Sequence, residues 1–230
     1  AAKLSEIEAG NGVDSQPPNR VGPRRATKVY GISGPGGAGK TTLIDELALR
    51  FLRAFPADHR LAILSHDPSV VGSGALLGDR ATMVYSQDNR VFMRSMATRG
   101  LAGGLAVASE RAVKFLRELE IFDAVIIETV GTGQEALPFG FDHSLTDLAV
   151  LVMPPDYGAR LQLMKIAMLD AADVVVVNKA DLRGARTAVS EIESRLRSNH
   201  RNHILLQTQA NRHRDPGVDE IFRTLFPQKV

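Results

Sequence analysis

The chain reads Gly34-Pro35-Gly36-Gly37-Ala38-Gly39-Lys40-Thr41 directly after a short apolar run, and a helical pattern begins near the last of these residues. The octapeptide fits the pattern G-x-x-x-x-G-K-T, and a strand, a glycine loop and a helix in that order form a phosphate cradle. Glycines let backbone N–H groups reach the phosphates without a Cβ in the way, and the helix N-terminus adds partial positive charge. We therefore predict a nucleotide site, against the alternative of a glycine-rich turn that only connects a strand to a helix.

The cradle assigns roles to individual side chains. Lys40 is expected to bridge the terminal phosphates and to act in catalysis, and the Thr41 hydroxyl is expected to ligate Mg²⁺. The residues predicted to surround the phosphates are Gly36, Gly37, Ala38, Gly39, Lys40, Thr41 and Thr42.

A second motif predicts the base. Four consecutive valines at 174–177 are typical of a strand buried on both faces, and Asn178-Lys179-Ala180-Asp181 follows at its carboxyl end, where α/β sheets bind ligands. N-K-x-D is the guanine-reading pattern of GTP-binding proteins, because the Asp181 carboxylate can accept from guanine N1–H and from its N2 amino group. Asn178 is expected to bridge the base and the phosphate loop, and the Lys179 stem to lie over the ring. The alternative is a polar strand end with Asp181 as a helix N-cap.

Three acidic residues are candidates for the metal site. Asp67 and Glu128 each follow an apolar run, and Asp79 lies in the glycine-rich loop 69–79. Mg²⁺ on a nucleotide takes few protein ligands and keeps several waters, so one or two of these carboxylates would suffice beside Thr41. The alternative for each carboxylate is a solvated turn residue or a cap.

A mobile catalytic loop is predicted after Glu128. Gly131-Thr132-Gly133-Gln134 is polar, and a pair of glycines suits a loop that rearranges between triphosphate and diphosphate states. Gln134 is expected to orient the attacking water, with Glu128 as a further catalytic candidate. The alternative is an ordinary surface loop.

Apolar runs alternate with helical patterns from Lys28 onward, which predicts an α/β fold of the P-loop NTPase type, with a mostly parallel, doubly wound sheet and helices on both faces. Residues 1–27 are expected to be a helix tail and linker that follow a preceding domain, and residues 28–230 the nucleotide-binding domain. Strands are predicted at 28–33, 60–65, 90–94, 122–128, 147–153, 173–178 and 203–208, and helices at 41–54, 101–119, 159–170, 185–198 and 217–226.

Composition limits the other possibilities. The chain has no cysteine, so disulfides and thiolate metal sites are excluded, and its formal net charge of only +2 implies no nucleic-acid partner. No apolar run approaches the roughly 18 residues of a membrane span, and no signal-peptide pattern opens the chain. We expect a cytoplasmic protein without membrane or nucleic-acid partners.

The order of the motifs carries a more specific resemblance. GPGGAGKT is followed by HDPS, GALLGDR, VFMRSMATRG, ETVGTGQ, PPDYGARLQL, VNKADL and QTQANRHRDPGVDEIF. Over residues 28–226 the chain resembles the G-protein chaperones of cobalamin-dependent acyl-CoA mutases, the family of the methylmalonyl-CoA-mutase-associated GTPase. It is most similar to the G-domains of fused isobutyryl-CoA mutases, in which mutase and chaperone share one polypeptide.

The resemblance implies Mg²⁺-dependent GTP hydrolysis that gates cofactor loading, or protection, of an acyl-CoA mutase, with GTP or GDP as the bound nucleotide. The mutase would act in trans or be fused in the parent chain, and adenosylcobalamin would be bound only by the mutase. Homodimerisation of this chain is a further possibility. The family further implies a third switch at 154–165 that senses the mutase and a guanine-contacting loop at Gln209-Ala210-Asn211. It implies metal or nucleotide roles for Thr41, Asp67, Asp79, Glu128 and Thr129.

Two departures from the family pattern concern hydrolysis. The loop 67–74 is shorter than usual and lacks a basic residue, and Thr82 stands where family members tend to carry arginine. Sensing of the γ-phosphate is therefore expected to be weaker or differently controlled than in the family. A nucleotide-gated binding module with negligible turnover stays open.

Two enzymatic alternatives also stay open. The first is a nickel-delivery GTPase, which normally carries the cysteine or histidine-rich segments that this chain lacks. The second is a P-loop ATPase or kinase, which would transfer phosphate to an acceptor rather than release it.

Overall fold

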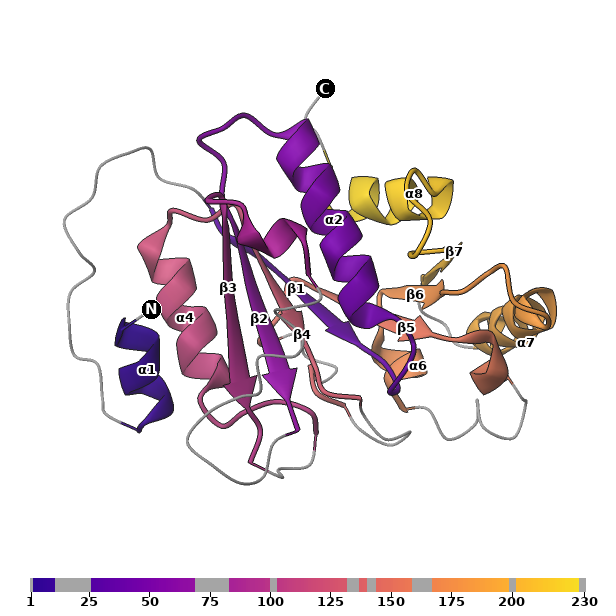
Figure 1. Ribbon diagram of the computed structural model, residues 1–230. Coiled ribbons are helices and arrows are strands. Elements are labelled where there is room, and N and C mark those ends of the chain that lie inside the picture. Colours follow the sequence, from indigo (N-terminus) through magenta and orange to yellow (C-terminus); the bar gives the residue numbers. More distant parts are fainter. Residues whose placement is uncertain are drawn as a thin grey trace.

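Seven parallel strands form one sheet in the computed structural model, which describes residues 2–10, 26–68, 83–99, 103–131, 137–139, 144–158, 167–198 and 202–227 (Figure 1). The spatial order is β3-β2-β4-β1-β5-β6-β7, and every neighbouring pair is parallel. The strands are β1 (Lys28–Ser33), β2 (Leu61–Asp67), β3 (Val91–Ala97), β4 (Ala124–Glu128), β5 (Leu148–Met153), β6 (Val174–Val177) and β7 (Ile204–Gln207).

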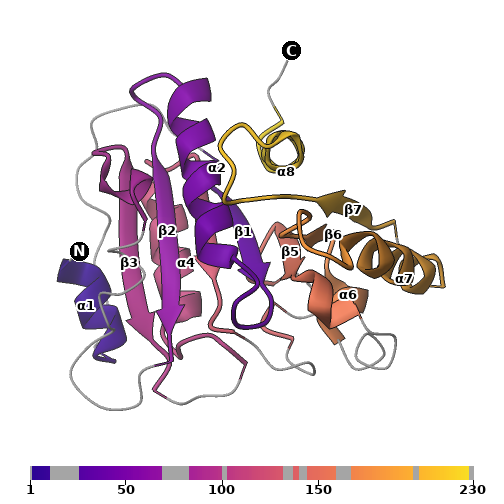
Figure 2. The same cartoon turned by 45° about the vertical axis from the view of Figure 1, so that its right-hand side comes forward.

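Helices cover both faces of this sheet (Figure 2). One face packs against α2 (Lys40–Ala54) and α8 (Pro216–Leu225). The other face packs against α1 (Ala2–Glu8), α4 (Ser109–Leu119), α6 (Ala167–Ala171) and α7 (Ala185–Arg197). Two short 3₁₀ segments, η1 (Tyr85–Gln87) and η2 (Pro155–Gly158), complete the described elements.

The central strands are apolar on both sides because both sides are covered. In β6, Val174 and Val176 face the core under α2 and α8, while Val175 and Val177 face the opposite core. All four side chains have no exposed surface. This alternation between two cores explains why the strand reads as an uninterrupted valine run, as expected for a parallel sheet covered on both faces.

The chain order reverses around β1, and that reversal gathers the polar strand ends. β1 lies between β4 and β5, so the loop after β1 opens at the point where the sheet winds both ways. Register places Ile32 opposite Glu128, and Glu128 opposite Ser65. Crevices outside the carboxyl ends of strands at such a point are where open α/β sheets bind ligands.

The predicted fold is confirmed, and one helix boundary is wrong. The helix predicted at 101–119 begins at Ser109. Gly103 and Gly104 have φ values of 97° and 79°, a left-handed conformation that stops a regular helix from starting earlier. The first part of the helix predicted at 159–170 lies outside the described residues, as does the predicted linker at 11–25.

The helix at the start of the chain packs on the domain. Leu4 and Ile7 of α1 are buried against the core under α4. Arg94 of β3 forms an ion pair with Glu8 and donates to Ser5 Oγ at 3.1 Å. The α1 helix therefore contributes to the same hydrophobic core as the sheet.

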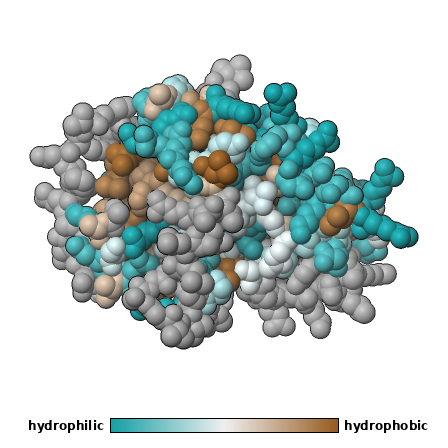
Figure 3. Space-filling model, in the orientation of Figure 1, coloured by the Kyte–Doolittle hydropathy of each residue, from teal (hydrophilic) through white to brown (hydrophobic). Residues whose placement is uncertain are grey.

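The surface is mostly hydrophilic on the face shown in Figure 3, where described hydrophobic residues gather in small patches. Among the described residues, no helix has the length and apolar character needed to cross a bilayer.

Candidate nucleotide site

The glycine loop between β1 and α2 has the backbone shape of a phosphate cradle. Gly37 and Gly39 have φ values of 74° and 87°, and helix α2 starts at Lys40, immediately after the loop. Lys40 is 7% exposed, and its ammonium group donates to the carbonyl oxygens of Gly34 at 3.0 Å and Pro35 at 3.1 Å. Lys40 thus holds the loop closed from within, and its charge lies where phosphate oxygens would bind.

The end of β4 supplies a carboxylate beside the start of α2. Thr41 Oγ1 donates to Glu128 Oε1 at 2.7 Å, and Ser65 Oγ donates to Glu128 Oε2 at 3.1 Å. Glu128 is only 3% exposed. A hydroxyl and a buried carboxylate in contact form an oxygen donor set of the kind that Mg²⁺ prefers.

Two further predicted metal residues lie nearby. Asp67 ends β2 and is 6% exposed, and its carbonyl oxygen accepts from the backbone N–H and hydroxyl of Thr98. Thr129 is buried directly after Glu128, and its hydroxyl donates to Ser33 Oγ at 3.3 Å. Asp79 lies outside the described residues.

No group of three or more His, Asp or Glu side chains in the described ranges could hold a metal alone.

The loop after β4 lies directly against the phosphate loop. A Cβ on Gly131 would approach the backbone nitrogen of Gly36 to 2.6 Å and its Cα to 2.8 Å. Only glycine fits at that distance. The two loops are therefore in direct contact, and a movement of the loop at Gly131 would displace the phosphate loop. Gln134, the predicted water-orienting residue, and Thr82 lie outside the described residues, as do the loop 69–80 and the third switch beyond residue 158.

The N-K-x-D segment lies on the other side of the phosphate loop. Asn178 is 2% exposed, and its Nδ2 donates to the Ala38 carbonyl oxygen at 2.9 Å. A Cβ on Gly39 would lie 2.4 Å from the same nitrogen, which explains why glycine is required there. Asn178 therefore links the phosphate loop to the end of β6, while its expected contact with the base stays a prediction.

The segment after β7 is tied to the same asparagine. Asn178 Oδ1 accepts from the Thr208 hydroxyl and from the Ala210 backbone N–H, both at 3.0 Å. This contact brings Gln209 and Ala210 beside the N-K-x-D segment, and their predicted contact with guanine stays a prediction. Thr208 is a further residue of the candidate site, and its only signal in the sequence is a hydroxyl at the end of the last predicted strand.

A pocket of about 250 Å³ lies between these three segments. Asp181 is exposed and lines it beside Lys179, whose φ of 58° turns the chain sharply after β6. The lining residues are Gly39, Thr42, Asn178, Lys179, Asp181, Leu182, Ala210 and Asn211. The pocket adjoins the phosphate loop and carries the side chains that the motif assigns to the base.

A buried histidine supports the carboxylate end of the site. His66 Nδ1 donates to the Glu128 carbonyl oxygen at 2.8 Å, which leaves Nε2 to accept from the Ser109 hydroxyl at 2.6 Å. Burial lowers the pKa of His66 to about 4, although the hydrogen bond to Glu128 partly opposes the shift. His66 therefore acts through its neutral side chain, linking the backbone of Glu128 to the first residue of α4.

Stability is expected to depend on pH through His66. Because its pKa falls from 6.5 to about 4 on folding, the unfolded chain binds the proton first as pH drops. The contribution of neutral His66, about 3 kcal/mol, is present above pH 6.5 and lost between pH 6.5 and 4. Urea unfolding in EDTA at pH 7.5, 6 and 5 should show His66→Gln losing less stability than the wild type across this window. A slope in His66→Gln that runs parallel to that of the wild type would contradict the assignment.

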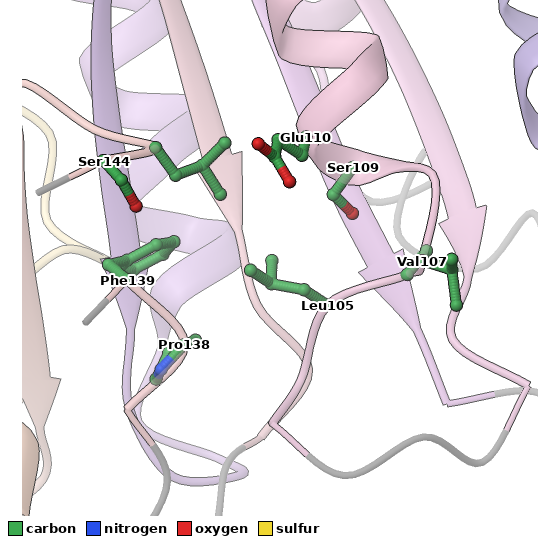
Figure 4. A pocket seen from close by; sticks show the side chains of 9 residues that line it. Leu105, Val107, Ser109, Glu110, Pro138, Phe139 and Ser144 are labelled. Atoms are coloured by element: carbon green, nitrogen blue, oxygen red, sulfur yellow. The ribbon is translucent and has the colours of Figure 1, made fainter.

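A second pocket of about 310 Å³ lies beside the loop that follows β4 (Figure 4). Leu105 and Val107 approach it from the segment before α4, and Phe139 and Ser144 from the other side. The Val130 backbone N–H donates to the Gly104 carbonyl oxygen at 3.1 Å. The residue before Leu105 is thus hydrogen-bonded to the loop that carries Gly131.

Comparison with known proteins gives one family. The model of the family described as methylmalonyl Co-A mutase-associated GTPase MeaB matches residues 20–226. A fused isobutyryl-CoA mutase from Geobacillus kaustophilus is 39% identical over 208 residues, covering 86% of this chain and 18% of the relative. The mitochondrial methylmalonic aciduria type A homolog of Mus musculus is 37% identical over 153 residues, covering 66% of this chain and 35% of the relative. The chain thus spans about a fifth of the fused relative's length.

Solved structures give the fold. HypB from Helicobacter pylori, in complex with nickel, superposes with a TM-score of 0.65 at 19% identity, covering 88% of this chain and 86% of that one. The signal recognition particle receptor FtsY from Elizabethkingia anophelis, in complex with GDP, gives 0.55 at 15% identity, covering 99% and 71%. At these identities the likeness concerns the fold alone. The family match, in contrast, confirms the predicted resemblance: the chain belongs to the MeaB family of methylmalonyl-CoA mutase-associated GTPases.

Proposed function

We propose that this chain binds GTP with Mg²⁺, hydrolyses it slowly, and thereby gates cofactor loading or protection of an adenosylcobalamin-dependent acyl-CoA mutase. The observation that carries the proposal is Asn178, which hydrogen-bonds the phosphate loop through Ala38 and the predicted base loop through Ala210. A single buried side chain thus couples the two halves of a guanine nucleotide site. The family match supports the mutase as partner, in trans or in one polypeptide, and adenosylcobalamin would be held by that mutase.

The phosphate end of the site supplies charge rather than a covalent nucleophile. Lys40 and the backbone N–H groups of the glycine loop would stabilise the charge that develops on the γ-phosphate during in-line attack by water. Thr41 and Glu128 would hold Mg²⁺, which would neutralise further negative charge. Asp67, at the end of the neighbouring strand β2, is a further candidate ligand. We further propose the roles that the sequence predicts for three residues. Asp79 and Thr129 would contribute to the metal site, and Gln134 would position the attacking water.

Glu128→Gln is expected to weaken Mg²⁺ binding selectively. The amide keeps the shape of the side chain and its contact with Thr41 but removes the negative charge that a divalent cation requires. The apparent Mg²⁺ affinity of the GDP complex should fall about 10-fold or more, while GDP binding in EDTA changes little. Titration of Mg²⁺ against a fluorescent GDP analogue measures both quantities. Glu118→Gln on the exposed side of α4 is the matched control, and an unchanged Mg²⁺ affinity in Glu128→Gln would remove Glu128 from the metal site.

Steady-state phosphate release tests the proposed function. GTP and ATP are compared with and without a cobalamin-dependent acyl-CoA mutase that lacks its own G-domain. Turnover selective for GTP that rises with the mutase is the expected result. Turnover that ignores the mutase would leave the GTPase and remove this partner, and equal turnover of ATP would contradict guanine recognition. GTP binding without measurable release would favour a nucleotide-gated binding module.

The remaining proposals concern location and assembly. We place the protein in the cytoplasm, the compartment expected for a chain without cysteines. A homodimer is a further proposal, tested by light scattering with GDP and with a non-hydrolysable GTP analogue.

A further inference from the structure

A buried ion pair lies on α2 behind the phosphate loop. Glu46 and Arg50 are four residues apart on this helix, with side chains 6% and 9% exposed, and Arg50 Nη1 lies 2.6 Å from Glu46 Oε2. Two charges in such a position lose most of their hydration, so a pair of this kind contributes little net stability compared with well-packed apolar residues. We therefore consider which other residues Glu46 and Arg50 bind, because those contacts indicate a role other than stabilising the helix.

Those partners lie on the segment that follows the base loop. Arg50 Nη2 donates to the Asp215 carbonyl oxygen at 3.3 Å, and Arg50 Nε donates to Asp219 Oδ1 on α8 at 2.7 Å. Glu46 Oε1 lies 2.6 Å from His213 Nδ1. Three separate points of the chain between 213 and 219 are thus attached to α2, the helix that begins at the phosphate loop.

The base loop at 209–211 is therefore held from both ends. Upstream, Asn178 accepts from Thr208 and from Ala210. Downstream, Glu46 and Arg50 hold His213 and the backbone of Asp215. The phosphate loop and the base loop thereby share one rigid support in α2.

The start of α8 shows how tightly this support is built. A Cβ on Gly217 would lie 1.8 Å from the carbonyl oxygen of Gln207, the last residue of β7. Asp215 caps the helix, since its Oδ1 accepts from the Val218 backbone N–H at 3.0 Å. The first turn of α8 is therefore pressed against the backbone from which the base loop departs.

We propose that Glu46 and Arg50 are positioning residues for guanine recognition: they hold the loop 209–211 at the correct distance from the phosphate loop without touching the nucleotide. The inference rests on the proposed GTP site and adds two specificity-supporting residues to it. Arginine suits this position because its planar fork directs three separate nitrogens to three partners, whereas the donors of lysine all lie on one nitrogen.

The test compares a ligand that has a base with one that has only phosphates. Calorimetry with GDP and with inorganic tripolyphosphate is run on the wild type, Arg50→Met and Glu46→Gln. Because small misplacements of binding groups are strongly felt, GDP affinity should fall about 10-fold in Arg50→Met while tripolyphosphate affinity stays within about twofold. Equal weakening of both ligands, or no change in either, would overturn the proposal.

Arg90→Met is the matched control. Arg90 donates to the carbonyl oxygens of Leu52 at 2.7 Å and Phe55 at 3.1 Å, so it also ties α2 to its surroundings, but at the end far from the nucleotide. Loss of Arg90 should lower the thermal midpoint and leave the GDP-to-tripolyphosphate affinity ratio at the wild-type value. A changed ratio in this control would mean that any loosening of α2 disturbs base binding, which would overturn a specific role for Arg50.

A milder variant covers the case in which Arg50→Met does not fold. Asp219 is 44% exposed, and Asp219→Asn removes one charge from the network while keeping its shape. It should lower GDP affinity several-fold with tripolyphosphate binding unchanged, and a wild-type ratio in this folded variant would count against the proposal. The wild type itself reports on the proposed function, since equal binding of GDP and ADP would reject the guanine site whatever the variants do.

Discussion

Replacing Lys40 by alanine is expected to lower the affinity for GDP and GTP by about a thousandfold. The ammonium group is held at the mouth of the phosphate loop by the carbonyl oxygens of Gly34 and Pro35. Charged hydrogen bonds of this kind contribute about 2 kcal/mol each, so two lost phosphate contacts amount to about 4 kcal/mol, or a factor of about 10³. The same substitution leaves two loop carbonyls without their donor, which loosens the cradle further.

Displacement of a fluorescent GDP analogue measures this loss. Lys28→Ala is the matched control, because Lys28 stands at the exposed start of the same β1 strand, with 61% of its side chain exposed and an ion pair at 3.8 Å to Asp147. An exposed pair of this kind contributes little, so this variant should bind GDP as the wild type does. GDP affinity within tenfold of the wild type in Lys40→Ala would reject the phosphate cradle.

The parts of the site that could be predicted from sequence are those in which one short segment carries the whole signal. The glycine loop and the N-K-x-D segment each combine a strand end with a fixed spacing, and the structure places them on either side of the same pocket. Asn178 reaches Ala38 as the motif suggests because β5 alone separates β1 from β6 in the sheet.

The parts that could not be predicted depend on strand order. Ser65 contacts Glu128 because β2 pairs with β4, although 63 residues separate them in the chain. His66 reaches Ser109 because α4 packs on the face of the sheet at the end of β2. Alternation of strands and helices predicts a parallel sheet but leaves open which strands become neighbours.

The burial of the Glu46–Arg50 ion pair could not be predicted from the sequence either. Glu46 and Arg50 at i and i+4 have the spacing of an ordinary ion pair on an exposed helix face. The two side chains are buried because α8 packs over them, and α8 lies far from them in the sequence. Their connection to the base loop is therefore a property of tertiary structure that no local pattern contains.

Asp181→Asn is expected to change which base the site accepts. Asp181 lines the base pocket in a turn that is fixed by two backbone hydrogen bonds, from Ala180 to Thr208 O and from Leu182 to Lys179 O, both at 3.0 Å. The carboxylate can accept from both N1–H and the N2 amino group of guanine, whereas an amide presents one acceptor and one donor. Losing a hydrogen bond and facing a donor with a donor should lower GTP affinity by about 10⁴.

Xanthine carries a carbonyl oxygen where guanine has its amino group, so the asparagine amide can donate to it and accept from N1–H. Asp181→Asn should therefore bind XTP more tightly than GTP, while the wild type shows the opposite order. Competition of both nucleotides against a fluorescent GDP analogue, and of tripolyphosphate as a base-free reference, measures the exchange. Asp58→Asn, at an exposed aspartate before β2, should keep the wild-type preference. Unchanged GTP affinity in Asp181→Asn would mean that the pocket reads the base through other groups, and Asn178 and the loop 209–211 would then have to carry the selectivity alone.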